Sequence, residues 1–363
     1  MRRRLLYRLG AAVASDHAVT AAGESRDHVP AHPSESVQTY LHVRPPPETV
    51  RHNRTPVRRF TMTPKGPFDL ATQREFFGGW PSPPSDAGAI VMAFPVEGWR
   101  SSAAVLLRQE PRGRIVGEVN GAGAEAAKAW RQALATLSLD VDGRTYPALG
   151  RRDAVIGKLQ ERYGLTRPTL FLSPYEAAAH FVLSHRRSVA QSRATRARLA
   201  EEHGDRFEID GGSFYAFPRP QKLRRLRLAR GLDPERLVRL HGIAEAALDG
   251  TLDRDRLRRL SVDRALAEIR ALRGIGEFFA QGILFRGAGI VDDVTSDEQL
   301  RLAVQRAYGM RALPDSAEVE RIADGWRPYR MWAEVLLVLE LMHEGGRHGL
   351  TSRPRGRRRT VDA

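Results

Sequence analysis

The spacing of apolar residues changes along the chain, and the change predicts two kinds of structure. In the first part, three short apolar runs at 89–96, 103–109 and 114–119 are separated by turn residues, which is typical of antiparallel strands. A helical pattern follows at about 124–137, with apolar positions at Ala127, Trp130, Leu134 and Leu137. We therefore expect a small α+β domain over 65–150, with an antiparallel sheet and a helix.

From about Thr169 onward, apolar residues recur almost everywhere at helical spacing. Ser173 and Glu176 form the pattern of a capping box, with Pro174 at the first helical position, so a helix is expected to begin there. Further helices are expected over about 188–204, 221–229, 234–240, 242–249, 262–272, 277–285, 297–307, 316–325 and 328–344. The prediction is a mostly α domain over 151–346 that follows the α+β N-terminal domain.

Both ends of the chain differ from its middle in composition. Residues 1–64 are rich in Ala, Ser, His, Arg and Pro without sustained periodicity, and residues 347–363 are rich in Arg. We expect a disordered extension and a basic disordered tail. Of the net charge of +15, residues 1–60 and 347–363 carry +5 each. A basic surplus favours a polyanion such as nucleic acid, although solubilising tails explain it equally well.

Several classes of protein and site are excluded by composition. The chain has no cysteine, so disulfides, a cysteine nucleophile and cysteine-ligated zinc or iron–sulfur clusters are ruled out. No run of eighteen apolar residues is present, so no membrane-spanning helix is expected. The histidines are scattered, so we expect no metal site made of side chains.

The segment Leu272–Ala280, with the sequence LRGIGEFFA, places two glycines around one aliphatic residue between two helical patterns. It predicts a tight hairpin between helices, because glycine tolerates a positive φ. Bare N–H groups at Gly274 and Gly276 can approach a phosphate closely, at the start of the second helix. An ordinary glycine turn at a helix end gives the same pattern. Asp297 follows Gly276 by 21 residues.

With this hairpin and the spaced aspartate, the chain resembles the helix-hairpin-helix superfamily of DNA base-excision glycosylases. Within it, the chain is most similar to the 3-methyladenine DNA glycosylase II family of alkylation repair. The resemblance covers about 65–346 and includes the Pro174-Tyr175-Glu176 helix start, the Phe217-Pro218 loop and the segment Trp326–Arg330. It implies a monomeric cytoplasmic enzyme, nucleoid-associated if bacterial, whose partner is double-stranded DNA containing damaged bases, with no membrane partner.

In this family the amides of the hairpin grip a phosphate beside the lesion, and carbonyls of the turn often hold a monovalent cation. The resemblance therefore makes Arg273, Gly274, Ile275 and Gly276 DNA-binding residues. It gives the carbonyls of Leu272 and Ile275 as ligands for a structural Na⁺ or K⁺, and it implies no other cofactor.

Asp297 matches the catalytic aspartate of the family. A carboxylate there stabilises the oxocarbenium character that the deoxyribose acquires as the base leaves, or orients the attacking water. Asp297 or its neighbour Ser296 is also a good helix N-cap, and one residue can serve both purposes.

Phe278 stands where bifunctional relatives carry a lysine nucleophile, two residues after the second glycine. The resemblance thus implies a monofunctional enzyme that uses water and leaves an abasic site. An aromatic ring at Phe278 can stack on a cationic alkylated base, with a core position beside Phe279 as the alternative. Tyr175 and Trp332 are further candidates for the base pocket, and core packing is their alternative too.

Two segments depart from the family pattern. Val294 stands where the family usually has a proline, three residues before the aspartate. His185, Arg186 and Arg187 replace the glutamine-containing loop that fills the gap left by the flipped nucleotide. Arg186 is the candidate wedge, because a guanidinium both stacks and hydrogen-bonds, and His185 and Arg187 are candidate DNA contacts. The alternatives are a non-catalytic DNA-damage-binding protein on this scaffold and a glycosylase for deaminated or oxidised bases.

Overall fold

Four antiparallel strands form the N-terminal sheet, in the spatial order β1-β4-β3-β2. The computed structural model describes residues 57–73 and 88–348, with side chains up to Glu344. The strands are β1 (Arg58–Met62), β2 (Ala89–Pro95), β3 (Ser102–Gln109) and β4 (Ile115–Gly121). The three predicted strands are confirmed, with ends shifted by at most two residues.

Strand β1 lies inside the segment that we expected to be disordered, so that prediction was wrong for these residues. It pairs with β4 from Arg58 opposite Val119 to Met62 opposite Ile115. It is a five-residue edge strand in which only Phe60 and Met62 are half-buried, so its alternation is too short to stand out in the sequence. Residues 1–56 lie outside the described part of the chain.

The two faces of the sheet are covered by different elements. Helix α1 (Ala126–Thr136), which follows the 3-10 turn η2 (Gly123–Glu125), packs on one face. Gly117 of β4 makes room for it, since a Cβ there would lie 2.3 Å from the Trp130 ring. The other face is covered by a hairpin of β5 (Arg206–Ile209) and β6 (Gly212–Tyr215).

The β5–β6 hairpin contradicts the expectation that nearly everything after residue 169 is helical. A sequence signal for it was present, because Asp210-Gly211 between two alternating runs is a type of turn that joins strands. Both residues have positive φ, +51° and +75°. The short alternating segments beside them bury Phe207 and Phe214 against the sheet.

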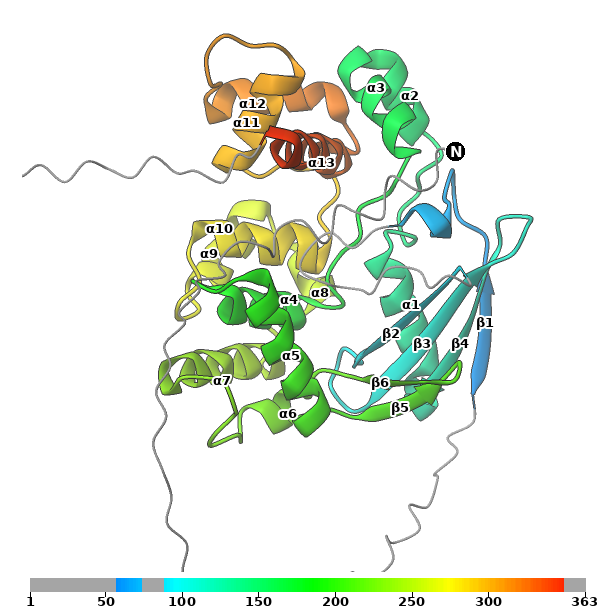
Figure 1. Ribbon diagram of the computed structural model, residues 1–363, viewed down its shortest axis with the longest axis vertical. Coiled ribbons are helices and arrows are strands. Elements are labelled where there is room, and N and C mark those ends of the chain that lie inside the picture. Colours follow the sequence, from blue (N-terminus) through cyan, green and yellow to red (C-terminus); the bar gives the residue numbers. More distant parts are fainter. Residues whose placement is uncertain (1–56, 74–87, 349–363) are drawn as a thin grey trace, which may run out of the picture. The chain divides into compact units, whose positions relative to one another are not determined.

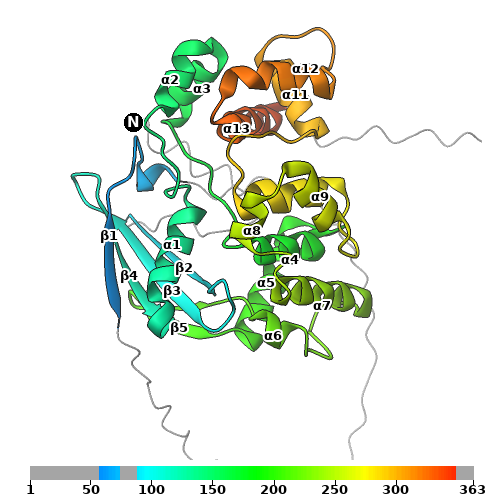
Figure 2. The same cartoon turned by 180° about the vertical axis from the view of Figure 1, so that it is seen from behind.

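The helices fall into two groups (Figures 1 and 2). Each group has its own apolar core. The group beside the sheet contains α4 (Pro174–Ser184), α5 (Val189–His203), α6 (Pro220–Leu223), α7 (Pro234–Leu248), α8 (Arg254–Arg259), α9 (Val262–Arg270), α10 (Glu277–Gln281) and the π-helix η3 (Gly282–Ala288). The other contains α2 (Tyr146–Arg152), α3 (Ala154–Tyr163), α11 (Glu298–Ala307), α12 (Ser316–Ala323) and α13 (Arg330–His348). Two 3-10 turns, η1 (Leu70–Thr72) and η4 (Asp324–Trp326), complete the described elements.

Some helix boundaries differ from the prediction. The two helices expected at 234–240 and 242–249 are one helix, α7, because Gly242 continues it without a break. The helix expected over 221–229 is only the single turn α6. Helix α13 continues through residues 347 and 348 of the predicted tail, and the rest of that tail is outside the described residues.

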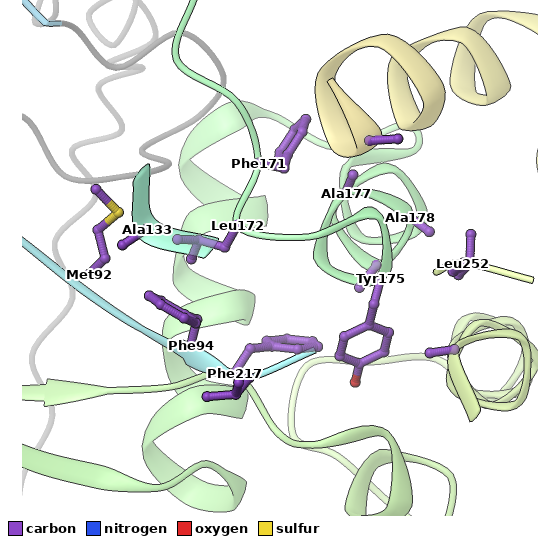
Figure 3. Close-up of a cluster of buried hydrophobic side chains, with 14 of the residues drawn as sticks. Met92, Phe94, Ala133, Phe171, Leu172, Tyr175, Ala177, Ala178, Phe217 and Leu252 are labelled. Atoms are coloured by element: carbon purple, nitrogen blue, oxygen red, sulfur yellow. The ribbon is translucent and has the colours of Figure 1, made fainter. Parts of the chain in front are cut away.

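The sheet and the adjacent helices share one apolar core. Met92 and Phe94 of β2 point at Ala133 of α1 and lie in the same cluster as Tyr175 of α4 (Figure 3). The described residues from 57 to 343 form one compact unit by their contacts. The division at residue 150 into two domains stays a prediction.

Arg167 joins the N-terminal segment to the helices. Its guanidinium is fully buried and donates to the carbonyls of Lys65, Pro67, Ser138 and Val141, at 2.6–3.1 Å. It also lies 5.2 Å from the centre of the Trp332 ring of α13. One side chain therefore connects the segment before η1, the end of α1 and the C-terminal helix.

No helix within the described ranges combines the length and the apolarity that crossing a membrane requires.

Candidate active site

A pocket lies where the two groups of helices meet, and it contains two of the predicted site residues, Asp297 and Phe278. Helix α4 contributes Phe181, and α10 with η3 contributes Phe278, Gly282 and Arg286. The remaining lining residues come from the start of α11 and from α13: Thr295, Asp297, Gln299, Glu334, Val335 and Val338. Two phenyl rings and two valines thus form apolar walls around a small set of charged and polar groups.

Asp297 is both the N-cap of α11 and part of the pocket. Its Oδ1 accepts a hydrogen bond of 2.8 Å from the N–H of Leu300. Among the described residues, no donor binds the second carboxylate oxygen, Oδ2. One oxygen of this side chain therefore fixes the helix start, and the other is available to a molecule in the pocket.

The segment before Asp297 is held from two sides. Thr295 donates from its N–H and its hydroxyl to the two carboxylate oxygens of Glu334, each at 2.9 Å. Ser296 is held by Gln281, whose Nε2 donates to Oγ at 2.7 Å. Val294, which replaces the family proline, is buried in the core of the C-terminal helices. The departure at Val294 is thus accommodated by packing and by side-chain hydrogen bonds.

The predicted helical hairpin is present between α9 and α10. Gly274 has a φ of +84°, which favours glycine, and a Cβ there would lie 2.9 Å from Cδ of the Arg239 side chain that packs on it. Ile275 is buried in the core and donates from its N–H to the Leu272 carbonyl at 3.0 Å. The Leu272 carbonyl keeps a second lone pair, with which it could bind a cation. The monovalent cation at the hairpin stays a prediction.

Gly276 begins α10 and faces open space. No atom lies within 4 Å of the position that a Cβ would take, and no side chain caps the helix there. Within the described part of the chain, the N–H groups of Gly274 and Gly276 donate to no protein acceptor. Exposed, unpaired amides at a helix start can bind an anion, and the phosphate site at this hairpin stays a prediction.

The α4–α5 turn lies next to this hairpin. Arg239 of α7 packs on Gly274, and its Nη1 is 3.4 Å from Nδ1 of His185. The His185 ring is half-buried and stands edge-on to Phe279, with the ring centres 5.9 Å apart. Arg186 is exposed, with a φ of +54°. The turn therefore presents Arg186 to solvent, while His185 is held against α7 and α10.

Arg187 has a role inside the protein that the sequence did not indicate. Its guanidinium donates to the Thr195 hydroxyl at 2.9 Å and to the Gly231 carbonyl at 2.8 Å. These bonds tie the turn to α5 and to the loop before α7. The predicted DNA contact at Arg187 would have to be made by a side chain that is already engaged twice.

Two residues assigned to the base pocket from sequence do not line it. Tyr175 is fully buried beside Phe217 (Figure 3) and against the ring of Trp99, and its hydroxyl donates to the Pro218 carbonyl at 2.8 Å. Trp332 is fully buried against Tyr146, with ring centres 4.8 Å apart. Both are core residues, so their assignment is corrected. Phe278, by contrast, is 51 % exposed and lines the pocket, while Phe279 stacks on Phe181 and packs on the core.

The capping box predicted for α4 is only half formed. Ser173 accepts from the N–H of Glu176 at 3.1 Å, as expected. The Glu176 carboxylate turns away and pairs with Arg196 at 3.3 Å. Burial raises the pKa of Glu176 to about 7, and Arg196 opposes that effect. The complete capping box is at the next helix, between Ser188 and Gln191.

Glu334, Gln281 and Arg286 belong to the site and were not predicted. Burial raises the pKa of Glu334 to about 7 and lowers that of Arg286 to about 9. A signal for Glu334 was available, because it is the single acid in the apolar run 331–339, and buried acids are rare. Within the described residues, no group of three or more His, Asp or Glu side chains is arranged to hold a metal.

Comparison with known proteins gives a sequence relative and several similar solved structures. No protein-family model matches the chain. It is 25 % identical over 215 residues to the DNA-3-methyladenine glycosylase of Bacillus subtilis (strain 168), a match that covers 55 % of this chain and 68 % of the relative.

Solved structures are similar over most of the chain. The 3-methyladenine DNA-glycosylase of Archaeoglobus fulgidus is 20 % identical, with a TM-score of 0.59, covering 81 % of this chain and 99 % of that one. The 8-oxoguanine glycosylase/lyase of Clostridium acetobutylicum is 16 % identical, with a TM-score of 0.52, covering 70 % and 86 %. The chain is therefore similar in sequence to a DNA-3-methyladenine glycosylase, and its fold is similar to that of solved DNA glycosylases.

Proposed function

We propose that the protein is a DNA glycosylase that takes a damaged base, an alkylated purine, into the pocket and hydrolyses its N-glycosidic bond. The observation that carries the proposal is the meeting of Asp297 and Phe278 in one pocket near a hairpin with unpaired amides. The name of the Bacillus subtilis relative, a DNA-3-methyladenine glycosylase, supports the substrate class.

The proposed chemistry uses water and one carboxylate. A cationic base stacks on the exposed Phe278 ring, and the free Oδ2 of Asp297 faces the sugar. The bond between C1′ and the base nitrogen breaks, and its electron pair neutralises the base. The carboxylate stabilises the positive charge that develops on the sugar. Water oxygen then bonds to C1′, and its proton passes to Asp297 or to solvent.

The absence of a suitable lysine supports a monofunctional enzyme. The whole chain has four lysines, at positions 65, 128, 158 and 222. No lysine is among the residues that line the pocket within the described chain. A Schiff base with the sugar needs an amine next to C1′, so we propose that the product is an intact strand with an abasic site.

On the DNA side, we propose that the amides of the hairpin bind a phosphate and that Arg186 enters the minor groove. Arg239 links the two elements, so the phosphate contact and the wedge lie on neighbouring parts of one surface. Arg273 is exposed beside the hairpin and adds positive charge to this surface.

A panel of lesions tests the function directly. Duplexes with 7-methylguanine, 8-oxoguanine or uracil are incubated with the protein, and free base and strand breaks are measured before and after alkali. We expect release of the methylated base, and strand breaks after alkali only. Strand breaks without alkali would indicate a lyase. Release of 8-oxoguanine or uracil in place of the methylated base would replace alkylated purines as the proposed substrate class. DNA binding with no release from any duplex would support the non-catalytic alternative.

Gly276→Asp should weaken binding to damaged and undamaged duplexes alike, by tenfold or more. The side chain has open space and an allowed φ of −89°, so the fold should persist while the new carboxylate repels the phosphate. Fluorescence anisotropy measures the affinity. Gly325→Asp is the matched control, because it also places a carboxylate in open space, on an exposed turn. Equal affinities of the Gly276→Asp variant and the wild type would eliminate the hairpin as a phosphate site.

Phe278→Ala should slow release of the methylated base by about ten- to a hundredfold, because stacking on one aromatic ring contributes ~1–3 kcal/mol per base. The exposed ring contributes little to the core, so the melting temperature should change little. Phe278→Trp keeps an aromatic face and should retain most of the rate. The comparison uses single-turnover kinetics, and a fast Ala variant would argue against stacking.

A further inference from the structure

We propose that Glu334 is a positioning residue for Asp297. Glu334 holds the segment Thr295–Asp297 by hydrogen bonds and does not act through its charge. The inference rests on the proposed function, because it concerns the geometry of the same pocket. It identifies a residue on the last helix that has no counterpart in the hairpin motif.

Glu334 binds Thr295 through both carboxylate oxygens. The Thr295 N–H donates to Oε2 and the Thr295 hydroxyl donates to Oε1, each at 2.9 Å. Two parallel bonds to one residue restrict its rotation more than a single bond does. Since Thr295 lies two residues before Asp297, the backbone that carries the aspartate is anchored to α13.

Gln281 anchors the next residue to another helix. Its Nε2 donates to the Ser296 hydroxyl at 2.7 Å, and its Oε1 accepts from the Ser296 N–H at 3.3 Å. Gln281 lies on α10, three residues after Phe278. The element that carries the pocket ring and the helix that carries Glu334 therefore both fix the segment that carries Asp297.

This double anchoring compensates for a flexible residue in the backbone. A proline has a fixed φ, whereas Val294 does not restrict its own φ in that way. Four hydrogen bonds from Glu334 and Gln281 to the next two residues supply the missing restraint. A misplacement of 1 Å can cost a reaction about a hundredfold in rate, so such a restraint matters for the chemistry.

The charge of Glu334 is not required for these bonds. Burial raises its pKa to about 7 and the facing Asp297 carboxylate adds to this, whereas the hydrogen bonds from Thr295 and the charge of Arg286 lower it. Below that pH the protonated carboxyl can donate to the Thr295 hydroxyl oxygen, while its carbonyl oxygen still accepts from the N–H. Because a hydroxyl both donates and accepts, the anchor persists in both protonation states. Glutamine, which ends in a neutral amide, should therefore replace Glu334 with little loss in the rate of base release.

The experiment compares Glu334→Gln with Glu334→Met in the full chain. Single-turnover rates of release of a methylated base and affinities for duplex DNA are measured from pH 6 to pH 8. We expect the Met variant to be at least tenfold slower with unchanged affinity. The Gln variant should stay within about threefold of the wild type, with a parallel pH profile. A Gln variant as slow as the Met variant would show a role of charge and overturn the proposal, as would a Met variant as fast as the wild type.

Hydrogen exchange of the Thr295 and Ser296 amides gives a readout that does not depend on catalysis. Exchange should accelerate in the Met variant and not in the Gln variant; unchanged exchange in the Met variant would overturn the proposal. If the wild type releases no base, the proposed function fails while this measurement still tests the anchor. Should Glu334→Met fail to fold, Thr295→Val removes one of the two bonds without changing shape, and Thr295→Ser restores the hydroxyl.

Glu340→Met is the control on the same helix. Glu340 binds Arg162 and Tyr163 of α3, and it is not among the residues that line the pocket. Base release by this variant should match that of the wild type, whereas a fall equal to that of Glu334→Met would show that any lost contact of α13 slows the reaction.

Discussion

Asp297→Asn should lower the single-turnover rate of base release from methylated duplex DNA by at least a hundredfold and leave DNA affinity unchanged. The amide oxygen can still accept from the Leu300 N–H, and Asn is as good an N-cap as Asp, so α11 should remain intact. What disappears is the negative charge facing the sugar. Removal of a single group that stabilises a charged transition state typically costs about 10²–10³ in rate.

Asp315→Asn separates the loss of this charge from the loss of a helix cap. Asp315 caps α12 through an equivalent bond of 2.8 Å to the Glu318 N–H, and it does not line the pocket. Its substitution should leave base release unchanged. Equal rates for Asp297→Asn and the wild type would remove Asp297 from the mechanism. Absence of base release from the wild type, with DNA binding retained, would favour a damage-binding protein without catalysis.

Arg167→Met should lower the free energy of unfolding by about 3–5 kcal/mol, because it removes the donor of four hydrogen bonds and a carbonyl left buried without a donor costs about 1–3 kcal/mol. Methionine fills a similar volume but donates no hydrogen bond. The carbonyls of Lys65, Pro67, Ser138 and Val141 would lose a donor, and the bond to Ser138 lies in the buried interior. The contact with the Trp332 ring would lose its cation as well.

Urea denaturation followed by tryptophan fluorescence measures this loss. Arg144→Met is the control, because Arg144 is exposed and pairs with Asp142 on the surface. The control should leave the unfolding midpoint unchanged, since exposed ion pairs add little stability. An Arg167→Met variant with the wild-type midpoint would mean that the four carbonyls find other donors.

The hairpin and the cap of α11 were predictable because they depend on local backbone chemistry. Gly274 adopts a positive φ that few other residues tolerate, and Asp297 binds an N–H three residues ahead of it. Both rules act within a few residues. The strands β2, β3 and β4 were predictable for the same reason, since their apolar runs are bounded by turn residues.

Elements with weak local signals were harder to predict. Strand β1 has only two half-buried side chains, so its own sequence pattern is weak. Its pairing with β4 in the structure is what identifies it as a strand. The turn Asp210-Gly211 did carry a local signal, but the strands beside it have four residues each and lie between helices. Short elements depend on the surface that they cover, and that surface is distant in sequence.

The assignment of aromatic residues to pocket or core required the packing of whole helices. Trp332 and Glu334 are two residues apart on α13, yet the first is in the core and the second lines the pocket. Their positions depend on the rotation of α13 about its axis, which α2, α3 and α11 decide by packing against it. Tyr175, at the start of α4, is likewise placed by its neighbours Trp99 and Phe217.

By itself, the sequence determined strands β2, β3 and β4, most of the helices after residue 173, the glycine hairpin and the acid 21 residues beyond it, because these follow from residue periodicity and from short-range backbone geometry. Only the tertiary structure decided which side chains share the pocket with Asp297. The hydrogen bonds that Thr295 donates to Glu334 and that Gln281 donates to Ser296 join residues 39 and 15 positions apart. Such contacts depend on how separate helices pack, and no pattern within one segment encodes them.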